Sequence, residues 1–284
     1  MKLNNVVIRH LKKDKKNKDF IKSASRYKPI FIKPTASPHP RCNKTKVKAS
    51  QTRILNRGQI IQKTLNGDGI YNKADRSKCS VGFWARSNKN ENLNYLVTAG
   101  YCYDWRFNTT IQNFYHYPWN FNESLDSLRF LGKMAKPDNI GKYDFGLINI
   151  TGRNVGQSPV INNIDSETYV ELIIESNNII TSHGTHLCKS GLTTHVTCGY
   201  VRGLGAVGVH KDGVTEDNFI FYGKDSFETS CEGDSGGPAF SYLQSLLKVN
   251  LIGIHISHLK DFSASLPLDI ILREGELELV KVSG

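Results

Sequence analysis

The chain has 284 residues, of which 39% are hydrophobic and 22% are charged, as in an ordinary globular protein. Its formal net charge is +11. The sequence has no run of about 18 apolar residues, so we expect no membrane span, and it shows no heptad or longer repeat.

The positive charge is concentrated in an N-terminal arm. Residues 1–63 hold 18 Lys and Arg but only 2 Asp and Glu, and the remainder holds 19 basic and 24 acidic residues. We expect residues 1–65 to be a flexible leader or a propeptide remnant. A basic arm can bind nucleic acid, an anionic membrane or the acidic remainder of the chain. We do not expect nucleic-acid binding, because no aromatic-rich platform accompanies the charge.

Residues 66–284 are predicted to be all-β. Short apolar or alternating segments lie between turns rich in Gly, Asn and Asp, which is typical of β-strands. The expected strands are Ser80–Arg86, Asn94–Thr98, Phe145–Ile150, Asn218–Tyr222 and Leu251–Ser257. A short helix is expected over Pro267–Arg273, near the C-terminus.

The segment Gly203–Gly208 (GLGAVG) matches the glycine pattern of a dinucleotide-binding loop. Such a loop must follow a strand and open a helix. Here Val209–Gly213 (VHKDG) comes next, with residues typical of a strand and a turn. We therefore interpret the segment as part of a hairpin and expect no cofactor.

The most informative motif is Gly233–Pro238 (GDSGGP). A serine hydroxyl becomes a good nucleophile when a neighbouring base accepts its proton. The attacked carbonyl then becomes an oxyanion, which backbone N–H groups stabilise. Glycines on both sides of Ser235 give the backbone the freedom for such a tight turn. The sequence thus predicts a nucleophile at Ser235, the alternative being a glycine-rich turn with an incidental serine.

This motif resembles the nucleophile loop of the chymotrypsin-like serine proteases. Thr98–Cys102 (TAGYC) resembles that family's histidine loop, and Tyr143–Ile148 (YDFGLI) resembles the start of its aspartate strand. Cys188–Thr194 (CKSGLTT) and Thr197–Gly199 (TCG) resemble the streptogrisin and α-lytic branch.

The resemblance covers residues 66–284 and implies two antiparallel β-barrels of the trypsin type forming one protease domain. It assigns the nucleophile to Ser235, the orienting carboxylate to Asp144, and the oxyanion hole to the N–H groups of Gly233 and Ser235. Asp234 would support the loop. The implied partner is a peptide or protein segment in the cleft between the barrels.

The sequence departs from the family at Tyr101, which stands where the histidine belongs. A tyrosine hydroxyl has an ordinary pKa near 10, so about one part in a thousand is ionised at pH 7. A nearby Asp144 carboxylate would disfavour that anion further. We therefore expect a catalytically impaired peptidase homologue. The alternative is an active serine endopeptidase that uses Ser235, with His255 or His258 as the base or with a sequence error at position 101.

Four residues are candidates for substrate binding by the same resemblance: Thr229, Glu232, His255 and Ser257. Thr229 matches the base of the specificity pocket. Because it is not acidic, a trypsin-like preference for Lys or Arg is unsupported. Glu232 is expected at the rim.

The resemblance also implies two disulfides, Cys79–Cys102 and Cys188–Cys198. Their Cα atoms are expected about 4.4–6.8 Å apart. Cys231 lacks its usual partner, so we expect it and Cys42 to be unpaired. No CxxC occurs, and we expect no metal site. Disulfides favour an extracellular location, although residues 1–30 have no signal-peptide core.

Overall fold

The computed structural model of the protein describes residues 7–9, 18–26, 30–32, 62–106, 110–135, 137, 142–153, 155–209, 215–223, 229–259 and 262–282. The chain divides into two compact units, Met1–Arg41 and Cys42–Gly284. The larger unit carries all the predicted site residues.

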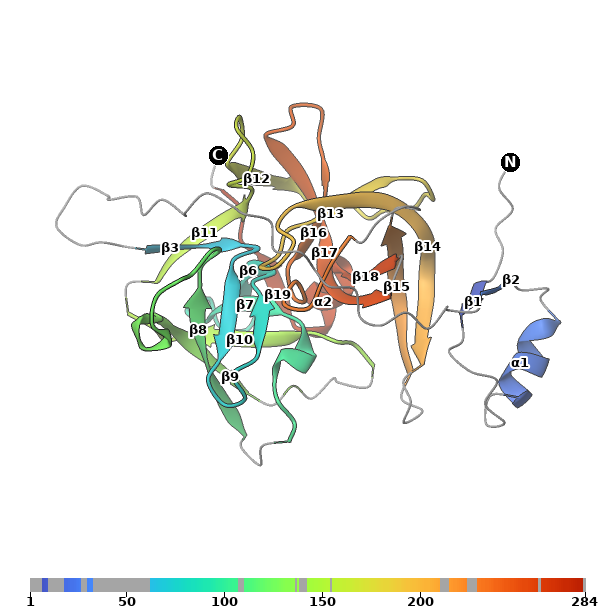
Figure 1. Ribbon diagram of the computed structural model, residues 1–284, viewed down its shortest axis with the longest axis horizontal. Coiled ribbons are helices and arrows are strands. Elements are labelled where there is room, and N and C mark those ends of the chain that lie inside the picture. Colours follow the sequence, from blue (N-terminus) through green and yellow to red (C-terminus); the bar gives the residue numbers. More distant parts are fainter. Residues whose placement is uncertain are drawn as a thin grey trace. The chain divides into compact units, whose positions relative to one another are not determined.

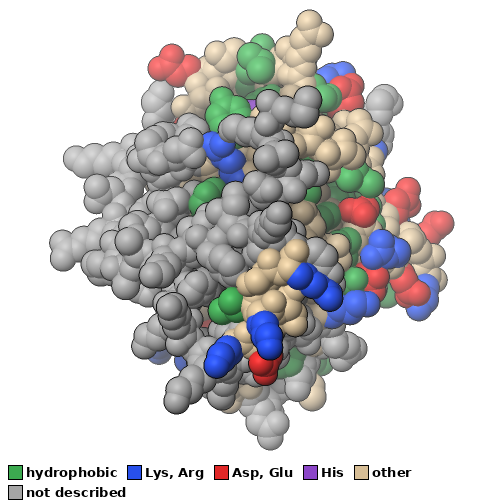
Figure 2. Space-filling model, turned by 90° about the vertical axis from the view of Figure 1, so that its right-hand side faces the viewer, with side chains coloured by type: hydrophobic (Ala, Val, Ile, Leu, Met, Phe, Trp, Pro, Cys, Tyr) green, Lys and Arg blue, Asp and Glu red, His purple; other side chains and the backbone are tan. Residues whose placement is uncertain are grey.

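The smaller unit contains three elements that the sequence analysis does not predict. Strands β1 (Val7–Arg9) and β2 (Ile30–Ile32) pair in parallel, and helix α1 (Lys18–Ser25) lies between them in the sequence. The negative charge of Asp19, in the first turn of α1, interacts favourably with the positive end of the helix dipole. Lys18 and Lys22 of α1 are exposed. Among the described residues on the face drawn in Figure 2, basic and acidic side chains are mixed.

The first large sheet has eight strands in the order β19-β6-β7-β10-β9-β8-β4-β5. Their bounds are β4 (Gly69–Asn72), β5 (Lys78–Ser80), β6 (Phe83–Ser87), β7 (Asn94–Thr98), β8 (Ile111–Tyr117), β9 (Phe130–Ala135), β10 (Gly146–Ile150) and β19 (Leu277–Leu279). All the pairings are antiparallel, and residues on β8 alternate between exposed and buried, as a strand with one face on a core requires. Phe83, Trp84, Leu96 and Ile148 are buried in this core.

The second large sheet has nine strands in the order β16-β13-β14-β15-β18-β17-β12-β11-β3, and β16 also pairs with β17. This extra pairing closes six of the strands into a barrel. The bounds are β3 (Gln62–Asn66), β11 (Val155–Asn162), β12 (Glu171–Ser176), β13 (His186–Lys189), β14 (Thr197–Val209), β15 (Thr215–Gly223), β16 (Pro238–Tyr242), β17 (Lys248–Leu259) and β18 (Phe262–Pro267). Apart from β3, Figure 1 shows the strands of this sheet in yellow-green to red, and, apart from β19, it shows those of the first sheet in cyan to green.

The expected all-β class is confirmed, and three elements match their predicted positions closely. β7 is the predicted strand, and β10 and helix α2 (Leu268–Glu274) lie within one residue of their predictions. The other two strands predicted after residue 200 lie within the longer β15 and β17. Gly203–Gly208 lies on β14, which forms an antiparallel hairpin with β15, as expected. No described helix has the length and apolar character that crossing a membrane demands.

The prediction of one continuous strand over Ser80–Arg86 is wrong. The chain leaves the sheet at Val81 and Gly82, which separate β5 from β6. A Cβ on Gly82 would lie 2.7 Å from the carbonyl oxygen of Gly236 and 2.8 Å from that of Val97. The backbone turns at Gly82 because it packs directly against the loop that carries Ser235, a contact that no local pattern reveals.

Candidate active site

The loop before β16 forms a tight turn around Ser235, and we call it the nucleophile loop after the role that the sequence predicts for this serine. Gly233 and Gly236 have φ values of +97° and +90°, in the left-handed region that favours glycine. A Cβ on Gly233 would lie 2.5 Å from Thr193 Oγ1, and one on Gly236 would lie 2.1 Å from Thr98 Oγ1. The two glycines are therefore required by both conformation and space.

Two backbone N–H groups of this loop are unused within the described chain. Neither Gly233 N nor Ser235 N donates a hydrogen bond to another described residue, whereas Asp234 N, Gly236 N and Gly237 N all do. Two unused donors flanking a serine are what an oxyanion hole requires. Ser235 itself is buried.

Asp234 holds the loop in place through a buried cluster of donors. Its Oδ1 accepts hydrogen bonds from the N–H groups of Thr193 and Thr194 at 2.8 and 3.0 Å. Its Oδ2 accepts from Cys231 N at 2.9 Å and from Thr194 Oγ1 at 2.5 Å. The Nζ of Lys189 lies 3.3 Å from Oδ2, and both side chains are fully buried.

Lys189 is a buried supporting residue of this loop to which sequence analysis gave no role. Its Nζ also donates to Thr194 Oγ1 and to the carbonyl oxygen of His195. Burial would raise the pKa of Asp234, but the Lys189 charge and the hydrogen bonds outweigh burial and lower it below its usual range. Burial lowers the pKa of Lys189, and Asp234 partly offsets this. The available signal was a lysine inside an otherwise apolar and small-residue segment next to Cys188.

Ser80 connects the first barrel to the same loop. Its backbone N–H donates to the Ser235 carbonyl at 2.7 Å, and its Oγ donates to the Gly233 carbonyl at 2.7 Å. The Oγ also accepts from Leu192 N at 2.9 Å. One buried serine on β5 thus fixes both carbonyls of the loop, and sequence analysis gave it no role.

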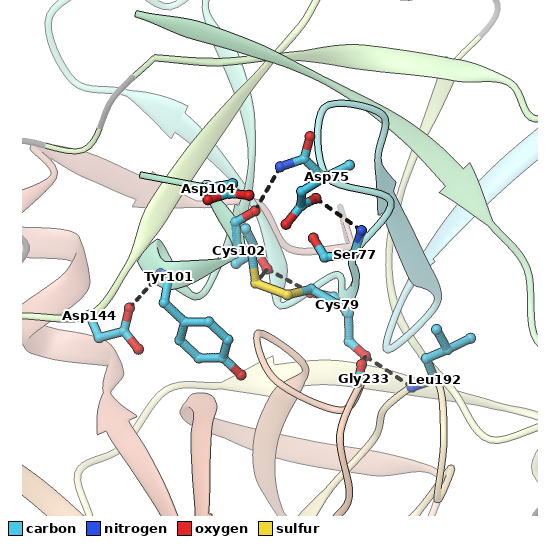
Figure 3. Close-up of a disulfide and its surroundings, with 12 residues drawn as sticks. Asp75, Ser77, Cys79, Tyr101, Cys102, Asp104, Asp144, Leu192 and Gly233 are labelled. Carbon is cyan, nitrogen blue, oxygen red and sulfur yellow. Dashed lines mark hydrogen bonds between the residues drawn. A yellow bond between two sulfur atoms is a disulfide. The ribbon is translucent and has the colours of Figure 1, made fainter. Parts of the chain in front are cut away.

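Tyr101 and Asp144 are brought together by strand pairing. Tyr101 lies in a short 3₁₀ turn, η2 (Gly100–Cys102), directly after β7, and Asp144 lies just before β10. These strands pair with Gly146 opposite Thr98. As Figure 3 shows, the backbone N–H of Tyr101 donates to Asp144 Oδ1, at 2.9 Å.

The Tyr101 side chain is oriented toward the nucleophile loop. In Figure 3 its ring extends away from Asp144 and toward the side on which Gly233 lies. Although 49% of the residue is exposed, withdrawal of the phenol from water raises its pKa above its usual value. A hydrogen bond with Ser235 opposes this shift, and the negative charges of Asp144 and Asp234 add to it. The phenol therefore keeps its proton.

Three of the described histidine rings have partners away from Ser235. His116 Nε2 lies 2.8 Å from Asp68 Oδ2, and His195 Nδ1 lies 2.7 Å from Asp165 Oδ2. His255 is fully buried, with Nδ1 at 3.2 Å from the Tyr222 hydroxyl. Within the described side chains, no histidine ring forms a hydrogen bond with Ser235.

The four candidate substrate-binding residues differ in their exposure to solvent. Thr229 and His255 are buried, whereas Glu232 and Ser257 are exposed. The backbone of His255 is tied to the nucleophile loop, since its N–H donates to Gly237 O and its carbonyl accepts from Gly236 N, both at 2.7 Å.

The cysteines confirm two predictions and correct two others. Cys79–Cys102 and Cys188–Cys198 form disulfides, with Cα–Cα separations of 6.2 and 3.9 Å. The second separation is below the expected range because the two cysteines face each other directly across the β13–β14 pair. Cys231, expected to be unpaired, is disulfide-bonded. Cys42, also expected to be unpaired, lies outside the described residues.

The sequence matches the model of the trypsin family over residues 89–265. A search of curated proteins gave no match.

The solved structures that resemble the chain include Thermobifida fusca protease A, with a sequence identity of 21% and a TM-score of 0.56. The match covers 77% of this chain and 99% of that protease. A glutamic-acid-specific serine protease, described as using a histidine triad in substrate binding, is 22% identical with a TM-score of 0.56, covering 76% of this chain and 100% of its own. A homologue of α-lytic protease, N4, is 17% identical with a TM-score of 0.54, covering 76% and 98%. At these identities the likeness shows the fold alone, and it confirms the two-barrel prediction.

Proposed function

The chain belongs to the trypsin family of serine proteases, and we propose that it binds peptide or protein segments between its barrels but hydrolyses them poorly or not at all. The observation that carries the proposal is the side chain beside Ser235. That side chain is a phenol with a raised pKa, where the reaction needs a group that accepts a proton at neutral pH.

The size of the expected defect follows from the triad's cooperativity. Removal of one member of such a unit can lower turnover by about 10⁶. The oxyanion hole and substrate binding can retain about 10³–10⁴ over water. Since Gly233 N and Ser235 N are unused among the described residues, this residual rate is available to the chain.

The rest of the loop supports binding as the retained function. Asp234, Lys189 and Ser80 hold the turn through buried contacts that do not depend on the identity of residue 101. We propose an extracellular setting, because the disulfides persist where thiols are oxidised. One structural neighbour prefers glutamate, but at 22% identity any preference of this chain must rest on its own residues.

The test is labelling with a fluorophosphonate, which reacts with activated serines, alongside a turnover assay on a mixed peptide library. The unmodified chain should remain unlabelled, like a Ser235→Ala control, while an active serine protease in the same tube is labelled. Binding of the same peptides is measured by fluorescence anisotropy.

Labelling at Ser235 that is lost in Ser235→Ala would instead establish the active endopeptidase. In that outcome His255 and His258 are the bases to substitute next. Absence of both labelling and peptide binding would refute the proposal.

A further inference from the structure

Three side chains of the kinds that bind metal ions lie on one face of the β13–β14 pair. His186 and Cys188 are two residues apart on β13, so their side chains leave the strand on the same side. Cys198 lies directly opposite Cys188 on β14. A ring nitrogen of His186 and the two sulfur atoms all lie within 4.8 Å of one another. We call these three residues the thiol–imidazole cluster.

The cluster can be reached from the surface. His186 is exposed and Cys198 is half-buried, whereas Cys188 is buried beneath them. The His186 ring packs edge-on against Tyr200, its neighbour across the strand pair, with ring centroids 5.7 Å apart. The members meet only through strand pairing, so the lack of a CxxC motif, from which we expected no metal site, does not bear on this cluster.

The two sulfur atoms form a disulfide in the folded chain, and a thiol reductant would make them available. One thiolate of a dithiol attacks a sulfur of the Cys188–Cys198 bond and forms a mixed disulfide, which its second thiol then resolves. The dithiol loses two electrons and becomes a cyclic disulfide, and Cys188 and Cys198 become thiols. A cysteine binds metal as its thiolate, so the metal site exists only after this step.

The geometry of the reduced cluster suits zinc. Nδ1 of His186 lies 3.8 Å from Sγ of Cys188. With bonds of about 2.3 Å to sulfur and about 2.1 Å to nitrogen, two ligands of a tetrahedral zinc ion are about 3.6 Å apart, so this edge is nearly in place. Two sulfur ligands would be about 3.8 Å apart. The freed sulfurs therefore need to separate, and rotation of the half-buried Cys198 side chain can supply this movement.

The charges also suit zinc. Two thiolates and a neutral imidazole balance the two positive charges of the ion. Lys189 follows Cys188 on β13, but successive side chains on a strand face opposite ways, and its Nζ lies 3.3 Å from Asp234. Thiolate and imidazole ligands favour zinc over magnesium or calcium. The cluster has three members among the described residues, which leaves the fourth position of a tetrahedral ion to water.

The cluster lies at the base of the turn that holds the nucleophile loop. Cys188 and Cys198 enclose Thr193 and Thr194, whose backbone N–H groups donate to Asp234. The disulfide closes this segment at its two ends. A zinc ion bound to the same two sulfurs would close the same segment, so either crosslink keeps the turn together.

We propose that the thiol–imidazole cluster is a zinc site of the reduced chain. When a dithiol opens the Cys188–Cys198 disulfide, His186, Cys188 and Cys198 bind one Zn²⁺, and the two thiol protons pass to the solvent. The ion replaces the disulfide as the crosslink at the base of the turn. This inference goes beyond the proposed function and depends neither on peptide binding nor on hydrolysis.

The experiment uses cobalt(II), which takes the place of zinc and absorbs visible light. The full chain is reduced with a dithiol, freed of excess reductant by gel filtration without air, and titrated with Co²⁺. We expect absorption bands typical of tetrahedral cobalt bound to thiolates, which Zn²⁺ abolishes at one equivalent per chain. The competition gives the Kd for zinc. The oxidised chain should give no thiolate–cobalt band.

Variants assign the ligands. His186→Ala should raise the Kd for zinc by more than the roughly 10- to 100-fold that loss of an outer-sphere partner costs. His183→Ala, also at an exposed position, is the matched control and should leave the Kd unchanged. Cys198→Ser should abolish the thiolate–cobalt band, whereas Cys102→Ser, in the other described disulfide, should keep it.

Melting curves test the role as a crosslink. Reduction should lower the Tm, and Zn²⁺ should raise the Tm of the reduced chain, because a ligand that binds the folded state stabilises it. The rise should be smaller in His186→Ala than in His183→Ala.

Three results would overturn the proposal. The first is a reduced chain, folded or unfolded, that gives no thiolate–cobalt band. The second is a band and a zinc Kd that are the same in His186→Ala and His183→Ala, since the metal would then be bound by other thiols. The third is a band that survives Cys198→Ser.

Discussion

The backbone N–H of Ser80, on β5 of the first sheet, donates to the carbonyl oxygen of Ser235, in the loop before β16 of the second sheet, at 2.7 Å. The Ser80 hydroxyl adds a bond to Gly233 and accepts one from Leu192. A single residue of β5 thus positions the nucleophile turn from the opposite barrel.

Ser80→Ala should lower the free energy of unfolding by about 1–3 kcal/mol, because it leaves a buried carbonyl and a partly buried N–H without their partner. Urea unfolding measures the change. Ser87→Ala is the matched control, since Ser87 Oγ also accepts two backbone hydrogen bonds but at an exposed site. The prediction fails if the two variants lose the same stability.

Tyr101→His should give the chain fluorophosphonate labelling at Ser235, because an imidazole with a pKa near 6.5 can accept the serine proton. Tyr101→Phe controls for loss of the phenol and should remain unlabelled. Recovery is expected to be partial, since the smaller ring leaves space around it. Labelling in Tyr101→Phe equal to that in Tyr101→His would show that the phenol merely blocks the site.

Lys189→Met should destabilise the fold by about 3–5 kcal/mol, because it leaves the Asp234 carboxylate buried without its cation. Lys248→Met is the control, as the Lys248–Glu175 pair is exposed and is worth less than about 1 kcal/mol. Chemical unfolding of both variants makes the comparison. Equal losses would mean that Asp234 is neutral in the folded chain.

Acid should destabilise the protein through Asp234. Its pKa is lower in the folded state, so its contribution to stability is complete above the unfolded pKa near 3.9 and is lost as the pH falls below about 4. Unfolding by urea at several pH values between about 6 and 2 gives the slope. Asp234→Asn should flatten that slope, and an unchanged slope would assign acid sensitivity to other groups.

Removal of the Cys79–Cys102 disulfide, by changing both residues to Ser, should cost about 2–4 kcal/mol. Both cysteines are buried, and the crosslink joins the Tyr101 turn to β5. Thermal unfolding under non-reducing conditions measures the loss. Peptide mapping that joined Cys79 to Cys188 would contradict the assignment.

Elements with a strong local signal were predictable from sequence. β7 (Asn94–Thr98) is an apolar run bounded by turn residues, and the turn of Gly233–Gly237 is encoded by its glycines. The ends of β5 and β6 were not predictable, because they depend on the approach of Gly82 to Gly236.

The supporting contacts of the site were hidden for the same reason. Ser80 contacts the nucleophile loop only because the two barrels pack together in the folded chain. The contribution of Lys189 depends on how deeply Asp234 is buried. His255 shows the limit of an analogy with cleft residues, since its ring lies under the surface against Tyr222. Sequence neighbours carry no information about such depth.

β5 acts as a spacer of fixed length. Two consecutive residues face opposite ways from it, as neighbouring side chains on a strand do: Cys79 is crosslinked to the Tyr101 turn and Ser80 is bonded to the nucleophile turn. The distance between the two turns is consequently set by the backbone of β5 and does not depend on the side chain at position 101. An exchange of the side chain at position 101 therefore leaves the distance between the two turns unchanged.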